Sequence, residues 1–300
     1  MATVYDIITL QIVNALEAGT VPWKKPWSTA CPTLNGEPVM DQNLFTKKPY
    51  RGVNWLLTAL APFSSPFWVP RGEIRKRKLK IKEGEHYTPI VYFKWRDAKE
   101  IEQAKREGKA VSPCFARFFQ AWNVEQLEGV EKFIPELDTP EEHDHTPIRK
   151  AVNVVENYTN KPEIKHNEPR AYYNALGDFI NMPELNVFDT PEDYHGTLFH
   201  ELVHATGHQK RLARDTLTEY APFGSVTYSK EELVAEIGSC FLCTTIGIDT
   251  PKTFESTASY IAGWLSKIKK DSRMVISAAQ QAQKAVDEIL QTKLKKIDKK

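Results

Sequence analysis

Hydrophobic residues recur at helical spacing in the first segment of the chain. Within residues 2–18 they occupy Val4, Ile7, Ile8, Ile12, Val13 and Leu16. Positions three and four apart lie on one face of an α-helix, so this segment is predicted to form an amphipathic helix packed against a core. Gly19 follows as a residue suited to ending that helix. A second, shorter helix is expected from about Val53.

Two later segments have the composition of β-strands. They are "TPIVYFKW", residues 88–95, and the aromatic-rich segment from Phe115 to Trp122. β-Branched and aromatic side chains favour the pleated, half-buried surface of a sheet. With the two helices, these strands predict a small α+β domain over residues 1–135.

The composition changes between the two halves of the chain. The segment "PELDTPEEHDHTPI", residues 135–148, has three prolines, five acidic residues and no large apolar cluster. Polar segments rich in proline favour loops and linkers. We therefore expect an acidic, proline-containing linker over residues 136–148 and a second domain over residues 149–300.

The second half of the chain carries mainly helical patterns. Helices are predicted over about 148–160, around the motif described below, from Ser229, and over about 251–297 with a break near Asp271. The segment "AYYNALGDFINMPE" predicts a short pair of strands. The predicted fold class is therefore α+β, with a small α+β N-terminal domain followed by a mainly helical domain that contains a small sheet.

The overall composition is that of an ordinary globular protein. Hydrophobic residues make up 41%, charged residues 26%, and the formal net charge is +1, so the charge of the whole chain indicates no class of partner. The sequence suggests neither a signal peptide nor a membrane-spanning stretch, so we expect a cytoplasmic location and no membrane partner. The four cysteines are too few for a disulfide scaffold, and Cys240 and Cys243 lie in an apolar run typical of a core.

The segment "GTLFHELVHATGHQKRL", residues 196–212, carries a metal-binding pattern. His200 and His204 are four apart and share one helix face, and Glu201 lies about 100° around the helix from His200, within reach of a metal-bound water. This H-E-x-x-H arrangement provides two zinc ligands and a general base. Apolar neighbours predict a buried helix, capped by Thr190, in which unpartnered histidines would be costly. Zn²⁺ is the expected ion, and Mn²⁺ is an alternative divalent cation.

A catalytic zinc needs a third protein ligand. The pattern with a third histidine six residues after the second fails, because that position is Lys210. His208 is one remaining candidate, and Glu232 and Glu236 on the next predicted helix are the others. We favour Glu232 as the ligand with Glu236 orienting a histidine. If Glu232 instead forms a capping box with Ser229, Glu236 becomes the ligand.

Such a site predicts amide hydrolysis. A bound zinc lowers the pKa of its water and polarises a carbonyl, while Glu201 takes a proton and passes it to the leaving amine. The predicted enzyme is therefore a zinc metallopeptidase of the gluzincin type.

The first half of the chain carries a signal for nucleic-acid binding. Residues 71–82 contain seven basic residues and one acidic residue, and aromatic residues lie among short basic stretches before them. Single strands are typically bound by a positive groove with aromatic rings on which bases stack. The predicted contacts are Trp23, Lys24, Lys25, Trp27, Lys47, Lys48, Tyr50, Arg51, Trp55, Arg75, Lys76, Arg77, Lys78 and Lys80.

Several segments together resemble the ArdC-type antirestriction proteins. "VPWKKPW", "KKPYRGVNWLL" and "AWNVEQLEG" resemble their N-terminal domain, which is also found in some plasmid primases. "TLFHELVHATGHQKRL" and "EELVAEIGSCFL" resemble the zincin-like metallopeptidase domain that follows it. The resemblance implies a plasmid-borne protein that binds single-stranded DNA non-specifically and protects incoming conjugative DNA from host restriction. It also implies His200 and His204 as metal ligands, Glu201 as general base and Glu232 as acidic ligand. Apart from the resemblance, we expect single-stranded DNA as a partner and a restriction component as a protein substrate.

Two other functions remain open from the sequence. The chain would be a DNA-coating protein if its metal site only supported folding. It would be a general metallopeptidase if the basic and aromatic residues had no role with nucleic acid.

Overall fold

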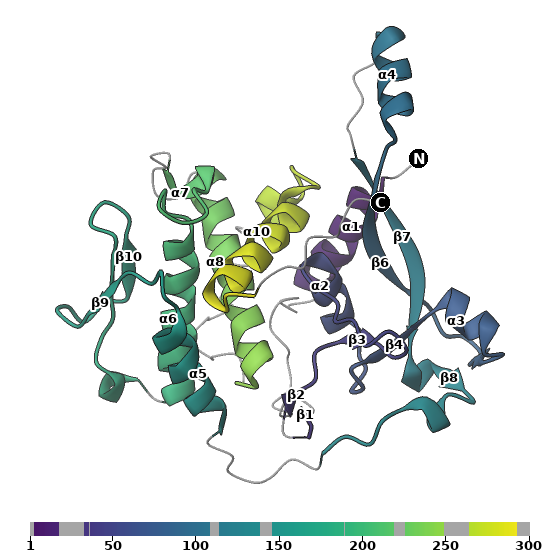
Figure 1. Ribbon diagram of the computed structural model, residues 1–300, viewed down its shortest axis with the longest axis horizontal. Helices are drawn as coiled ribbons and strands as arrows, with labels where there is room; N and C mark the ends of the chain where they lie inside the picture. Colours follow the sequence, from purple (N-terminus) through teal and green to yellow (C-terminus); the bar gives the residue numbers. More distant parts are fainter. Residues whose placement is uncertain are drawn as a thin grey trace.

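The computed structural model shows a mixed α+β protein with a sheet-rich N-terminal region and a helical C-terminal region that has a small sheet (Figure 1). This confirms the predicted fold class. The structure describes residues 3–17, 33–35, 37–108, 114–138, 146–188, 190–218, 226–248 and 264–292. In these parts of the chain, none of the helices combines the length and apolar character needed to cross a lipid bilayer.

The N-terminal region is built on a four-stranded sheet in the order β3-β4-β7-β6. Its strands are β3 (Gln42–Asn43), β4 (Phe67–Pro70), β7 (Cys114–Asn123) and β6 (Thr88–Trp95). Strands β3 and β4 are parallel, and the other two pairs are antiparallel. Both predicted strands are confirmed.

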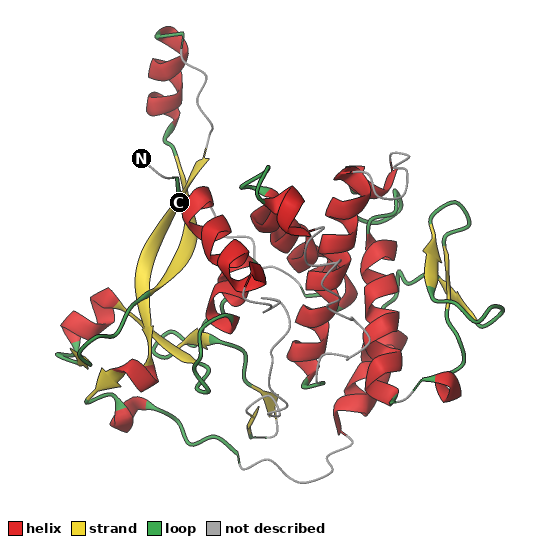
Figure 2. Cartoon of the chain, turned by 180° about the vertical axis from the view of Figure 1, so that it is seen from behind, coloured by secondary structure: helices red, strands yellow, loops and turns green. Residues whose placement is uncertain are grey.

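Strands β6 and β7 form a long hairpin, paired from Thr88↔Ala121 to Trp95↔Cys114. Helix α4 (Ala98–Arg106) lies at its far end, away from the rest of the molecule (Figures 1 and 2). The distal part of β6 is exposed, whereas its first half is mostly buried. The hairpin therefore presents much of its surface to solvent.

Helices and short strands surround this sheet. They are α1 (Val4–Glu17), α2 (Val53–Ala59), α3 (Arg71–Lys76), β1 (Thr33–Leu34), β2 (Glu37–Pro38), β5 (Lys80–Ile81) and β8 (Leu127–Glu128). Helix α1 confirms the predicted amphipathic helix, because Ile8, Ile12, Val13 and Leu16 are buried. Helix α2 confirms the helix expected from Val53.

The C-terminal region consists of helices beside a three-stranded sheet. The helices are α5 (Thr146–Asn157), α6 (Pro191–Thr206), α7 (Asp215–Thr218), α8 (Val226–Ile246) and α10 (Met274–Ile289). The predicted strand pair is confirmed as β10 (Tyr172–Asn174) and β11 (Phe179–Asn181), and β9 (Glu163–Lys165) adds to β11 in parallel.

The later helices differ in part from their predicted bounds. Helix α8 is already formed at Val226, so the predicted start at Ser229 is wrong. Ser229 lies inside the helix, which also excludes the alternative in which Ser229 and Glu232 form a capping box. The predicted break near Asp271 is confirmed, because residues 264–268 are helical and α10 begins at Met274. The other parts of that predicted helix, 251–263 and 293–297, lie outside the described residues.

One apolar core joins the two regions. It contains Ile8 and Ile12 from α1 and Trp55 from α2 together with Leu202 from α6 and Phe241 from α8. The rings of Trp55 and Phe241 meet edge to face with their centroids 4.9 Å apart. The N-terminal helices therefore contribute directly to the core behind the C-terminal helices, and the domain boundary at 136–148 stays a prediction.

Candidate metal centre

Helix α6 begins where local sequence signals place it. Thr190 precedes the helix with an extended backbone, and its Oγ1 accepts a hydrogen bond from the Asp193 backbone N–H at 3.1 Å. Pro191 occupies the first turn, where its missing N–H is tolerated. Two acidic side chains in that turn interact favourably with the positive end of the helix. These signals determine where the helix that carries His200 and His204 begins.

Helices α6 and α8 pack closely, because small residues line their contact. A Cβ atom on Gly238 would lie 2.8 Å from Cγ2 of Val203, which is closer than carbon atoms pack. One residue further, the Ser239 hydroxyl donates a hydrogen bond to the Gly196 carbonyl at 2.8 Å. This close approach brings Glu232 on α8 opposite the two histidines on α6.

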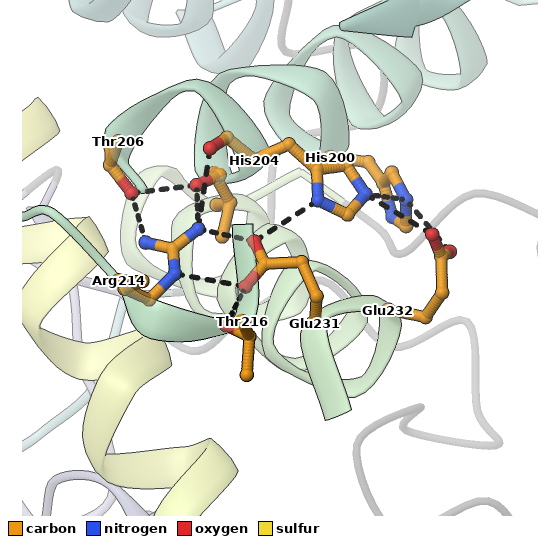
Figure 3. A network of polar contacts seen from close by, with 8 residues as sticks. His200, His204, Thr206, Arg214, Thr216, Glu231 and Glu232 are labelled. Atoms are coloured by element: carbon orange, nitrogen blue, oxygen red, sulfur yellow. Dashed lines mark hydrogen bonds and ion pairs between the residues drawn. The ribbon is translucent and has the colours of Figure 1, made fainter. Parts of the chain in front are cut away.

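Three ligand atoms converge at this contact, as Figure 3 shows. The Nε2 atoms of His200 and His204 are 3.1 Å apart. The Glu232 carboxylate lies 3.7 Å from Nε2 of His200 and 3.6 Å from Nε2 of His204. Nitrogen and oxygen ligands about 2.0–2.2 Å from one tetrahedral Zn²⁺ lie roughly 3.3 Å from each other. The spacing therefore fits a divalent cation bound between these three residues.

The charge around the histidines also fits a cation. Burial by itself would lower the pKa of the His200 imidazole, but the carboxylates of Glu232, Glu201 and Glu236 raise it to about 9. Glu201 and Glu236 are buried, and Glu232 is partly buried. Several carboxylates clustered in a poorly solvated site stabilise a positive charge, which a bound divalent cation would supply.

A second carboxylate, Glu231, orients His204. Oε1 of Glu231 lies 3.2 Å from Nδ1 of His204, on the side of the ring away from the ligand atoms. Although burial would raise the pKa of Glu231, its hydrogen bond to His204 and the charge of Arg214 hold that pKa far below the ordinary value. An ionised Glu231 accepts a hydrogen bond from Nδ1–H, which leaves Nε2 of His204 free to bind a metal.

Arg214 ties this carboxylate to the end of α6 (Figure 3). Its guanidinium donates to both oxygens of Glu231 at 2.5 and 3.1 Å, to the Val203 carbonyl at 2.6 Å and to the Thr206 hydroxyl at 2.6 Å. A Cβ on Gly207 would lie 2.8 Å from this guanidinium, so the helix end leaves room for it. Arg214 therefore satisfies last-turn groups of α6 and joins them to α8.

The structure places the predicted site residues as follows. It brings His200, His204 and Glu232 together and keeps Glu201 and Glu236 near them. His208 lies elsewhere: its Nδ1 accepts the Lys210 backbone N–H at 3.2 Å and stands 3.8 Å from Asp178. Sequence reasoning missed Glu231 and Arg214. Glu231 is adjacent to Glu232 in the chain, but no local pattern pairs it with an arginine 17 residues earlier.

The predicted DNA contacts divide into three groups. Trp23, Lys24, Lys25 and Trp27 lie outside the described residues. Tyr50 and Trp55 are only 7% and 1% exposed, so their rings are core residues and are not available for base stacking, contrary to our expectation. The third group consists of the predicted lysine and arginine contacts within residues 47–51 and 75–80.

The basic residues of the third group differ in their partners. Lys47 and Lys48 are exposed, and Arg51 forms an ion pair with Asp287. Glu73 neutralises part of the basic stretch, since it pairs with Arg77 at 2.9 Å and with Lys76 at 3.8 Å. Lys80 pairs with Glu128 at 3.0 Å, whereas Arg75 and Lys78 are exposed. The stretch is therefore less positive than its sequence suggests.

Taken together, the paired helices with a His–His–Glu site define a zincin-like metallopeptidase domain, here following a sheet-rich region. Residues 153–281 match the family described as zincin-like metallopeptidase, and residues 2–123 match the N-terminal domain of anti-restriction factor ArdC. The chain belongs to the ArdC family of antirestriction proteins.

Solved structures and curated relatives support this assignment. The metal-free crystal structure of antirestriction ArdC from plasmid R388 is 30% identical, with a TM-score of 0.71 over 95% of this chain and 96% of that one. The Mn(II)-bound structure of that protein is 28% identical, with a TM-score of 0.72 over 97% and 98%. Protein y4eC of Sinorhizobium fredii is 28% identical over 95% of this chain and 90% of its own length.

The chain also resembles part of a longer protein. It is 29% identical over 98% of its length to a DNA primase TraC of Escherichia coli, and 28% identical over 98% to a second TraC from that species. It spans only 27% and 20% of these two primases.

Proposed function

We propose that this antirestriction protein is a metal-dependent peptidase that also binds single-stranded DNA and protects incoming conjugative DNA from host restriction. The observation that supports the peptidase most directly is the convergence of His200, His204 and Glu232, with Glu201 one residue from the first histidine on the same buried helix. Zn²⁺ is the proposed ion from the zincin-like family, and Mn²⁺ is the ion in the related R388 structure.

The residues divide the chemistry between them. His200, His204 and Glu232 would hold the cation, which when bound supplies an acidified water and a polarised substrate carbonyl. Glu201 acts as general base, taking a proton and giving it to the leaving amine. Glu231 and Arg214 hold the His204 ring in the tautomer and orientation that a ligand needs. The amide C–N bond breaks, the hydroxyl of the water bonds to the acyl carbon to give a carboxylic acid, and the proton goes to the leaving nitrogen.

The proposed DNA role is supported by the match of residues 2–123 to the ArdC N-terminal domain. Exposed cations such as Lys47, Lys48, Arg75 and Lys78 suit phosphate contacts that are independent of sequence. The chain covers a minor part of the TraC primases, so primer synthesis is not part of the proposal. The proposed protein substrate is a component of the host restriction machinery.

Glu201→Gln tests whether hydrolysis contributes to protection. The variant keeps all three ligands, so we expect it to bind Zn²⁺ like the wild type, measured by elemental analysis after dialysis. We expect loss of cleavage of a fluorogenic peptide library and a lower yield of conjugation into a restricting host. A non-restricting recipient is the control. Unchanged protection by a metal-loaded Glu201→Gln protein would favour the DNA-coating function, with a metal that only joins α6 to α8.

A further inference from the structure

One face of the β6–β7 hairpin carries an unusual set of side chains. The register pairs Ile90 with Phe119, Tyr92 with Arg117, and Lys94 with Phe115. Opposed residues in a sheet share a face, and so do alternate residues along a strand. Tyr92, Lys94, Phe115, Arg117 and Phe119 therefore lie on the same face, which we call the hairpin face.

The opposite face of the hairpin is the one that packs on the core. Val91 belongs to the main apolar core, and the Asn54 side chain on α2 exchanges hydrogen bonds of 2.7 and 2.8 Å with its backbone. At the base of the hairpin face, Ile90 is buried in a smaller apolar cluster with Trp68, and Phe119 is partly buried against that cluster. Further along the face, Tyr92 is 42% exposed and Lys94 and Arg117 are exposed. The distal hairpin face is therefore open to solvent.

Rings and cations alternate on this face. The Arg117 guanidinium lies 5.1 Å from the Phe115 ring centroid, and the Arg96 guanidinium, just beyond the end of β6, lies 4.6 Å from the same centroid. The Tyr92 and Phe119 rings lie 6.2 Å apart. The hairpin face and the adjoining Arg96 together provide three aromatic residues and three cations, Lys94, Arg96 and Arg117.

We propose that the hairpin face is the surface on which this protein binds single-stranded DNA. The inference rests on the proposed DNA role. It places the base-stacking surface on the hairpin face and not on the basic 71–82 segment. Bases stack on the rings of Tyr92, Phe115 and Phe119, and phosphates contact Lys94, Arg96 and Arg117. A single strand fits better than a duplex, because only unpaired bases offer their faces to aromatic side chains.

Adjacent residues of β6 provide a matched test. Tyr92→Ala removes a ring from the hairpin face, and Phe93→Ala removes a ring of similar exposure, 38% against 42%, from the other face. The full chain is titrated against a fluorescein-labelled dT oligonucleotide at low salt, with binding followed by anisotropy. We expect roughly 5- to 150-fold weaker binding for Tyr92→Ala and little change for Phe93→Ala. Equal losses in the two variants would overturn the assignment of the face.

Charge reversal tests the phosphate contacts. For Lys94→Glu/Arg117→Glu we expect weaker binding and a log–log salt slope smaller by about 1.4, which is about 0.7 for each of two lost contacts. Lys270→Glu/Lys284→Glu changes net charge equally at exposed positions in the C-terminal region and should keep the wild-type slope. Loss of binding in the control pair but not in the hairpin pair would overturn the proposal. Circular dichroism melting of every variant checks that each is folded.

Two further outcomes separate this inference from the proposed function. If the wild-type chain fails to bind dT at all, the proposed DNA role itself is wrong. If the wild type binds dT but both hairpin-face variants bind as tightly, only the location is wrong. Competition with polyglutamate, a polyanion without bases, completes the test. If polyglutamate competes as effectively as dT, the surface binds polyanions in general, and the stacking assignment is overturned.

Discussion

Substituting Glu231 by Gln would remove one charge from a buried pair while keeping the shape of the side chain. Arg214 and Glu231 are only 3% and 5% exposed and lie 2.5 Å apart. Breaking a buried ion pair by removing one partner costs about 3–5 kcal/mol, because the other charge stays buried without compensation. At roughly 2–4 °C for each kcal/mol, the melting temperature of the metal-free protein should fall by about 6–20 °C.

The same substitution should weaken metal binding. Loss of an outer carboxylate that orients a ligating histidine typically lowers metal affinity about 10- to 100-fold. Calorimetric titration of the chelator-treated protein with Zn²⁺ measures this effect separately from stability. The two measurements report different contacts of Glu231. The melting temperature reports its ion pair with Arg214, and the Zn²⁺ affinity reports its contact with His204.

A double variant provides the control. Glu231→Gln/Arg214→Met removes both charges, so it should regain much of the lost melting temperature but not the metal affinity. The stability difference between wild type and Glu231→Gln also depends on pH. The native pKa of Glu231 is lowered, so its contribution is complete above the unfolded value of about 4.3 and is lost progressively as pH falls from that value through the lowered native pKa. A wild-type melting temperature and Zn²⁺ affinity in Glu231→Gln would refute this account.

Three further predictions follow from the packing and the ligand set. Gly238→Ala places a methyl group 2.8 Å from Val203, so overpacking should destabilise the protein by about 1–3 kcal/mol in urea unfolding and weaken Zn²⁺ binding; an unchanged midpoint would contradict the close α6–α8 contact. Glu232→Gln should lose most of the Zn²⁺ affinity in calorimetric titration, whereas His208→Ala should keep it, and the reverse result would make His208 the ligand. Trp55→Ala should destabilise the protein by about 3–5 kcal/mol in denaturant unfolding, because this ring is buried. The folded variant should keep its affinity for dT, and a selective loss of DNA binding would show that Trp55 is a DNA contact.

The motif helix could be predicted because its signals are local. Thr190, Pro191 and the four-residue spacing of His200 and His204 each act within one or two turns of chain. The β6 strand was found for the same reason, since its composition differs sharply from the polar residues around it.

Other parts of the site depend on contacts that local patterns do not encode. Arg214 reaches Glu231 only because α8 packs against α6, and both partners look like ordinary surface residues in the sequence. Ser229 satisfied the capping-box rule, yet helix α8 is already formed before it. For Trp55, nearby lysines and arginines suggested a DNA contact, but a ring beside cations in sequence can point to either side of a short helix.

The shared core means that the two halves depend on each other for folding. Trp55 packs against Phe241, and the Thr9 hydroxyl donates to the Ser272 carbonyl at 2.7 Å, so each half completes the interior of the other. A fragment that begins after residue 146 would expose the apolar side of α8 opposite Glu232 and lose rigidity in its metal ligands. Gene fusions that borrow this unit would therefore have to transfer it whole, with the sheet-rich and helical halves inherited together.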